Sequence, residues 1–166
     1  FLWKGFRMQS NSLTRKQSEK RSTQISNIQY KINLKLNKTD KQYSGDTNIK
    51  FSYTGNIDNE LIIDFITKEV LSVELNGQKT TDYRKDDNWL YIPSKDLKEG
   101  MNEVCICYIN DYDRSGSGFH RFIDPEDKEV YIHTDFEPYD AHRLFPCFDQ
   151  PNLKATYQLT VKGPKD

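Results

Sequence analysis

The chain has 166 residues, which suits one domain with a short extension, and no run of about 18 apolar residues predicts a transmembrane segment. Apolar residues account for only 35% of the chain, but an aromatic content of 13% supplies enough large side chains for a two-layer core. The net charge is -1. Residues 1–24 contain six bases and one acid, so the remaining residues carry a net charge of -6. This acidic body argues against a nucleic-acid partner.

Residues 1–24 form the first predicted unit, a basic extension with a short polar helix over residues 10–24. Ser12 or Thr14 is placed to cap the helix, but an apolar stripe is nearly absent, so the helix needs support from the rest of the protein. A basic, acid-poor segment of this kind suits a solvated helix or tail, a mitochondrial presequence remnant or a nucleic-acid arm. Its six bases are Lys4, Arg7, Arg15, Lys16, Lys20 and Arg21.

Residues 25–166 form the second predicted unit, a β domain. Apolar and polar residues alternate strictly over residues 28–36 and again over residues 47–53, which predicts a hairpin. Asn76-Gly77 favours a tight type I′ turn, because both residues accept a positive φ. Further strands are expected over residues 61–65, 71–75, 89–92, 104–109, 130–136 and 155–161, with a Gly/Ser loop over 110–120 and an irregular stretch over 138–154.

Short strands separated by turn signals, without a repeat or a βαβ alternation, indicate an all-β fold, an antiparallel sandwich or layered sheet with a short N-terminal helix. The three cysteines (Cys105, Cys107 and Cys147) do not have the spacing of a disulfide framework and favour a reducing compartment. A cytoplasmic location is therefore expected, and the basic N-terminus makes the mitochondrion the alternative.

Several short patterns permit a chemical interpretation beside a structural one. Cys105 and Cys107 share one strand face, but a zinc site needs about four ligands, so we favour two small buried residues. The segment 115–118 resembles a phosphate-binding loop only superficially, since no helix with a Lys follows it. His120 and His142 each stand beside an arginine, and structural hydrogen bonding is the default interpretation.

His133, Asp135 and Glu137 are spaced by two residues and share one side if their strand continues through Glu137. Three interpretations remain open: a solvated strand face, a charged wall of a substrate cleft, and a divalent metal site. The chain contains neither an HExxH motif nor a G-x-S-x-G elbow, so its composition and spacing do not indicate a self-sufficient catalyst.

Residues 131–157, YIHTDFEPYDAHRLFPCFDQPNLKATY, very closely resemble the signature stretch of the aminopeptidase N family of zinc exopeptidases. The resemblance continues upstream and covers about residues 12–163, where residues 118–125 look like the loop before the signature strand in bacterial-type members. The matching positions include Thr134, Phe136-Glu137-Pro138, Asp140-Ala141, Arg143, Phe145 to Asp149, Pro151 and Lys154-Ala155.

The resemblance implies a saddle-like β domain that packs against a thermolysin-like catalytic domain. In the family the catalytic domain holds the zinc ion, so Zn²⁺ is expected there and none is expected to be bound by this chain. The family resemblance also implies that the chain has no catalytic residue of its own and that the complete enzyme removes residues from peptide amino termini. Residues 145–151 are interpreted as structural.

Two substrate-binding residues follow from the resemblance. Glu137 matches the glutamate that the family's β domain lends to the active site to hold the free α-amino group of the substrate. Asp135 matches a position that many members fill with Gln, lining the pocket for the first side chain. An Asp there favours basic or small polar first residues, unless Arg143 holds it.

The family's β domains continue for several strands beyond residue 161, so an incomplete C-terminal edge of the sheet is expected. An open edge invites pairing with another strand. Either the polypeptide continues into further strands and the catalytic domain, or another polypeptide completes the edge. The alternative function is a stand-alone, non-catalytic structural or assembly subunit.

Overall fold

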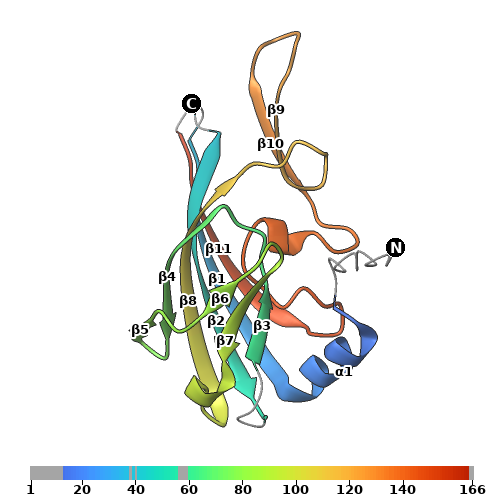
Figure 1. Cartoon of the computed structure of the whole chain (residues 1–166). Helices are drawn as coiled ribbons and strands as arrows, with labels where there is room; N and C mark the ends of the chain where they lie inside the picture. The colour runs from blue at the N-terminus through green and yellow to red at the C-terminus, as the bar shows by residue number, and fades with distance from the viewer. Residues whose placement is uncertain (1–12, 38, 40, 56–59, 165–166) are drawn as a thin grey trace, which may run out of the picture.

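A computed structural model describes residues 13–37, 39, 41–55 and 60–164 (Figure 1). The predicted all-β fold is confirmed: strands stack in layers, and one short α-helix, α1 (Arg15–Gln24), precedes them. Lys4, Arg7 and Ser12 of the predicted extension lie outside the described residues.

The first layer is a six-stranded sheet with the order β11-β1-β2-β8-β4-β5. The predicted hairpin is confirmed, since β1 and β2 pair antiparallel with Ile32 opposite Thr47. Asn76 and Gly77 both have positive φ angles, of 52° and 81°, as the predicted tight turn requires. The strands are β1 (Ile25–Lys35), β2 (Gln42–Tyr53), β4 (Glu69–Leu75), β5 (Gln78–Thr80), β8 (Gly100–Asp111) and β11 (Ala155–Lys162).

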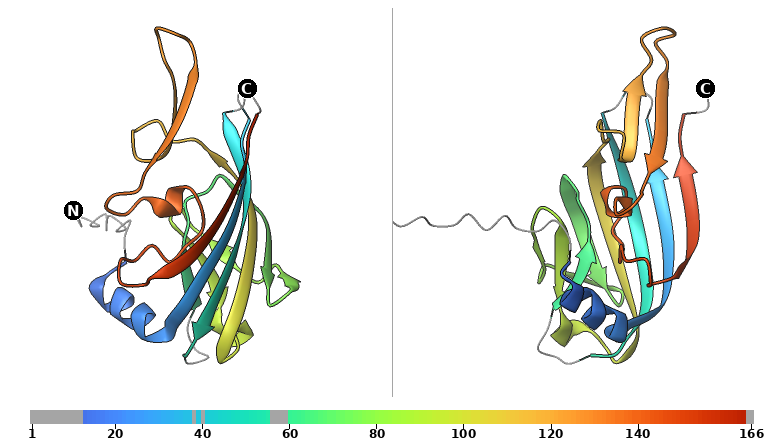
Figure 2. Two further views of the ribbon diagram at one scale, coloured as in Figure 1. Left: turned by 180° about the vertical axis from the view of Figure 1, so that it is seen from behind. Right: turned by 90° about the vertical axis from the view of Figure 1, so that its right-hand side faces the viewer.

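The second layer is a three-stranded sheet with the order β3-β7-β6, which lies over the first (Figures 1 and 2). It comprises β3 (Glu60–Asp64), β7 (Trp89–Pro93) and the short β6 (Arg84–Lys85), with the 3-10 helix η1 (Ser94–Asp96) after β7. Alternating apolar residues of both sheets face each other and form one core. Its fully buried members include Ile49, Phe51, Ile63, Leu90, Ile92, Ile106 and Tyr108.

A two-stranded hairpin of β9 (Gly118–Ile123) and β10 (Val130–Asp135) projects from one end of the layered sheets (Figure 2). The predicted loop over residues 110–120 is therefore wrong at both ends, because β8 continues to Asp111 and β9 begins at Gly118. The segment Gly118-Phe119-His120-Arg121 lacks period-two alternation, and it is a strand because it pairs with β10. The Asp113 amide also donates to the Phe119 carbonyl oxygen at 2.8 Å.

The purely antiparallel arrangement is corrected at one edge. β11 pairs parallel with β1, in a register that places Tyr157 beside Tyr30 and Val161 beside Leu34. Within the described residues, the other side of β11 has no strand partner. Tyr157, Leu159 and Val161 consequently extend the apolar face of β1 but stay 50–62% exposed.

This uncovered apolar face predicts self-association of the 166-residue chain through β11, because exposed apolar edges pair readily. Leu159→Lys should shift the mass measured by light scattering toward the monomer. Gln158→Lys adds the same charge on the opposite face of the strand and is the matched control. An equal response to both variants would show that net charge, and not the apolar face, controls association.

Helix α1 receives its support from one buried base. Thr14 caps the helix, accepting from the Gln17 amide at 3.3 Å, while the Gln17 side chain accepts from the Thr14 amide. Arg21 is only 5% exposed and forms an ion pair with Asp64 of β3. Arg21 is the only buried residue of α1, so the helix is solvated along most of its length and is fastened to the core by Arg21.

Candidate functional site

The segment after β10 forms a closed turn that presents Glu137. β10 ends at Asp135, so Glu137 does not continue the strand face of His133 as the spacing allowed. The Asp140 amide donates to the Phe136 carbonyl oxygen at 3.1 Å and closes the turn. The Glu137 amide donates to Asp135 Oδ1 at 3.3 Å. Asp135 and Glu137 are thus adjacent, and both are exposed.

The residues on either side of Glu137 are anchored, whereas its carboxylate is not. The half-buried Phe136 ring packs against Phe145, with centroids 6.5 Å apart, and the Tyr139 hydroxyl donates to Asp64 Oδ1 at 2.8 Å. Among the described residues, no side chain bonds the Glu137 carboxylate. A fixed backbone with an unpaired outward carboxylate suits the binding of a cation from outside this chain.

Arg143 does not hold Asp135, contrary to one of the two roles that the sequence suggested for that carboxylate. Its guanidinium pairs instead with Asp140 and with Asp113 at 3.1 Å. Arg143 therefore fastens the turn to the base of the hairpin. A Cβ at Gly118 would lie 2.3 Å from Asp113 Oδ2, and its φ is 71°, so this close contact requires glycine.

Asp64 is the structural centre behind the turn, and sequence reasoning did not select it. Its carboxylate is fully buried and accepts hydrogen bonds from four segments. The sequence signal is a single acid inside the apolar run 61–65, for which the pattern predicts only a strand. The donors are Arg21 Nη1 (2.5 Å), Arg21 Nη2 (3.2 Å), Trp89 Nε1 (3.0 Å), the Tyr139 hydroxyl (2.8 Å) and the Asp149 amide (2.9 Å).

The histidines have structural partners. His142 is buried and its Nδ1 lies 2.8 Å from Asp149 Oδ2, while His120 Nδ1 accepts from the Gly116 amide at 3.1 Å. His133 lies opposite His120 across the hairpin, with ring centroids 4.9 Å apart. The described residues contain no group of three or more His, Cys, Asp or Glu side chains that would hold a metal ion.

The cysteines do not form a reactive centre. Burial raises the pKa of Cys105 to about 11, and burial also raises the pKa of Cys147 well above its usual value. Both thiols are therefore protonated at neutral pH. Cys147 belongs to a loop that exchanges two backbone hydrogen bonds with Asp64, and its neighbours Phe145 and Phe148 are buried, so these three residues contribute to the core.

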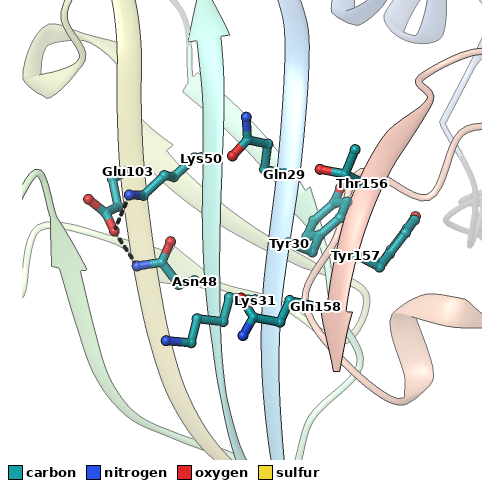
Figure 3. Close-up of a pocket in the computed structure, with 9 residues that line it drawn as sticks. All are labelled: Gln29, Tyr30, Lys31, Asn48, Lys50, Glu103, Thr156, Tyr157 and Gln158. Carbon is teal, nitrogen blue, oxygen red and sulfur yellow. Dashed lines mark hydrogen bonds and ion pairs between the residues drawn. The ribbon is translucent and has the colours of Figure 1, made fainter. Parts of the chain in front are cut away.

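A polar depression lies on the outer face of the six-stranded sheet (Figure 3). Its two best-placed charged groups are already satisfied, since Glu103 pairs with Lys50 at 3.7 Å and also accepts from Asn48. Its described lining comes from β1, β2, β8 and β11 and includes no residue of the 136–140 turn. This depression is therefore separate from the Glu137 site.

Comparisons with known proteins identify the relatives. The family described as the peptidase M1 N-terminal domain matches residues 26–166. Aminopeptidase N from Streptomyces lividans is 35% identical over 161 residues, which are 95% of this chain and 18% of that protein. Human glutamyl aminopeptidase is 47% identical over 51 residues, 30% of this chain and 5% of that protein. The chain thus spans about a fifth of its first relative.

Solved structures share the fold at low sequence identity. Leukotriene A4 hydrolase from Saccharomyces cerevisiae superposes with a TM-score of 0.71 at 19% identity, over 86% of this chain and 24% of that one. The M1 zinc metallopeptidase from Deinococcus radiodurans gives 0.65 at 17% identity, over 86% of this chain and 33% of that one. In the described part of the chain, no helix has the length and apolar character needed to span a bilayer.

Proposed function

Because the chain belongs to the peptidase M1 N-terminal domain family, we propose that it is the N-terminal β domain of a zinc aminopeptidase that removes single residues from peptide amino termini. The described residues contain no group of three or more possible metal ligands. In the family that the chain resembles, the catalytic domain holds the zinc ion, and the proposal places the metal in such a domain. The contribution of the β domain is therefore to bind and orient the substrate.

The observation that carries the proposal is the unpaired Glu137 carboxylate on an anchored turn. A peptide α-ammonium group is a compact cation with N–H donors, and a carboxylate binds it through charge-assisted hydrogen bonds. Fixing that amine fixes the distance from the amino terminus to the reacting peptide bond. Such an anchor selects terminal over internal peptide bonds.

Asp135 supplies the second part of the proposed site. It lies two residues from Glu137 and its Oδ1 accepts the Glu137 amide hydrogen, so the two carboxylates act from one short segment. The Asp135 side chain is exposed and is not neutralised by Arg143. A negative charge at the pocket for the first side chain favours basic first residues over acidic ones.

The test uses the natural polypeptide that carries this chain. We expect it to exceed the 19.6 kDa of these residues by several-fold, to contain zinc, and to cleave peptides with a free amino terminus but not their N-acetylated forms. A native product of 19.6 kDa without peptidase activity would instead support a stand-alone structural or assembly subunit. In that case the exposed β11 edge would be the first surface to examine for a partner.

A further inference from the structure

On the downstream side of Glu137, the Tyr139 hydroxyl attaches the turn to the protein interior. This hydroxyl donates to Asp64 Oδ1 at 2.8 Å, across 75 positions of sequence. Burial, with the nearby Asp64 charge, raises the pKa of Tyr139. The phenol is therefore protonated at neutral pH and donates to Asp64.

Asp64 is held through both its main chain and its side chain. Its main chain exchanges two hydrogen bonds with Cys147, at 2.9 and 3.1 Å, and its carboxylate is held by Arg21 of α1 and by Trp89 of β7. A side chain bonded to Asp64 is thereby held in place relative to the three-stranded sheet and to helix α1. Tyr139 is such a side chain, and it stands two residues from Glu137.

The other fastenings of the turn act at different points. The Phe136 ring packs against Phe145 on the upstream side, and Arg143 joins Asp140 to Asp113 at the base of the hairpin. Neither contacts Tyr139, whose hydroxyl is a separate attachment between Glu137 and Asp140. The Tyr139 ring also contacts His142, with centroids 4.5 Å apart, so a phenylalanine would keep the packing and lose only the hydroxyl bond.

We propose that Tyr139 and Asp64 are positioning residues for substrate binding: the buried Tyr139–Asp64 hydrogen bond holds the Glu137 turn so that its carboxylate meets the substrate amine. The inference rests on the proposed function, because it assigns these residues an effect that acts through Glu137. Arg21 belongs to the same chain of contacts, which makes helix α1 a remote support of the amine site.

The experiment is a double-mutant cycle in the complete aminopeptidase with Tyr139→Phe, Glu137→Gln and the double variant, measuring kcat and KM for a free-amine peptide. We expect Tyr139→Phe to lower kcat/KM by about 10-fold, mainly through KM, because misplacement of a binding group weakens an oriented contact. In the Glu137→Gln background, the same change should alter kcat/KM by less than about two-fold, since the group being positioned is gone.

Tyr91→Phe is the matched control. The Tyr91 hydroxyl also donates to an aspartate, Asp86 Oδ2, at 2.8 Å, but on β7 and away from the turn. This variant should leave kcat/KM unchanged. Because Asp64 keeps its other four hydrogen bonds in Tyr139→Phe, that variant should remain folded, as thermal unfolding would verify.

The outcomes separate the two proposals. An equal loss from Tyr139→Phe in both backgrounds, or no loss in either, overturns the positioning role while the amine-binding role of Glu137 stands. If Glu137→Gln alone leaves kcat/KM unchanged, the proposed amine anchor is wrong and the positioning role falls with it.

Discussion

Replacing Glu137 with glutamine in the proposed complete aminopeptidase is expected to lower kcat/KM for free-amine peptides by about 100-fold. The substitution keeps the shape of the side chain but removes its charge, and a hydrogen bond to a charged group contributes about 1.5–3 kcal/mol, equivalent to roughly 10- to 150-fold. The exposed position of Glu137 on the anchored turn predicts that the fold does not change. Steady-state kinetics and thermal unfolding of the same preparations measure both effects.

The matched control is Glu126→Gln, which removes one exposed carboxylate from the tip of the hairpin. It has the same effect on net charge and should leave kcat/KM within about two-fold, because exposed charges beyond about 10 Å are screened at ordinary ionic strength. A loss of similar size in both variants would indicate long-range electrostatics and would contradict a specific amine anchor.

The first-residue preference is a smaller expected effect at the same site. Asp135→Asn should reduce the preference for peptides that begin with a basic residue relative to those that begin with a small apolar one, by about 10-fold, since a charge-assisted hydrogen bond is worth about that much. Competition between two such peptides in one reaction measures the ratio. An unchanged ratio would place Asp135 outside the side-chain pocket.

The strands were predictable where their cause is local. Period-two alternation locates β1 and β2, and Asn76-Gly77 specifies the tight turn, because each depends on residues that are neighbours in sequence. The parallel pairing of β11 with β1 was not predictable, since it joins segments more than 100 positions apart. No property of the alternation in residues 155–161 distinguishes a parallel from an antiparallel partner.

At the candidate site, too, the features with a local cause were predictable and the long-range contacts were not. Glu137 follows from the resemblance of its sequence context, and the structure adds that the carboxylate is exposed on a fixed turn. The residues that support this turn were not predictable, because Asp64 is a single acid in an apolar run and its partners Arg21 and Tyr139 lie 43 and 75 positions away. A buried acid and a buried base are recognisable as a pair only once the fold brings them together.

The largest expected effect on stability is at this pair. Asp64→Ala should lower the free energy of unfolding of the 166-residue chain by about 3–5 kcal/mol, because it leaves the Arg21 guanidinium buried without its carboxylate. Arg21 is 5% exposed, and a guanidinium cannot shed its charge by losing a proton. Urea unfolding followed by circular dichroism measures the change, and Glu60→Ala is the control. It breaks the exposed Arg84–Glu60 pair and should cost about 1 kcal/mol or less.

Arg21→Ala should be less destabilising than Asp64→Ala. Without Arg21, the buried Asp64 carboxylate keeps the donors of Trp89, Tyr139 and Asp149, which continue to compensate its charge. After Asp64→Ala, by contrast, the Arg21 guanidinium stays charged and has lost its carboxylate. Urea unfolding of the two variants measures the difference. Equal losses from both would mean that the two side chains contribute packing alone, and the Arg21–Asp64–Tyr139 series could not then transmit an electrostatic restraint to the turn that carries Glu137.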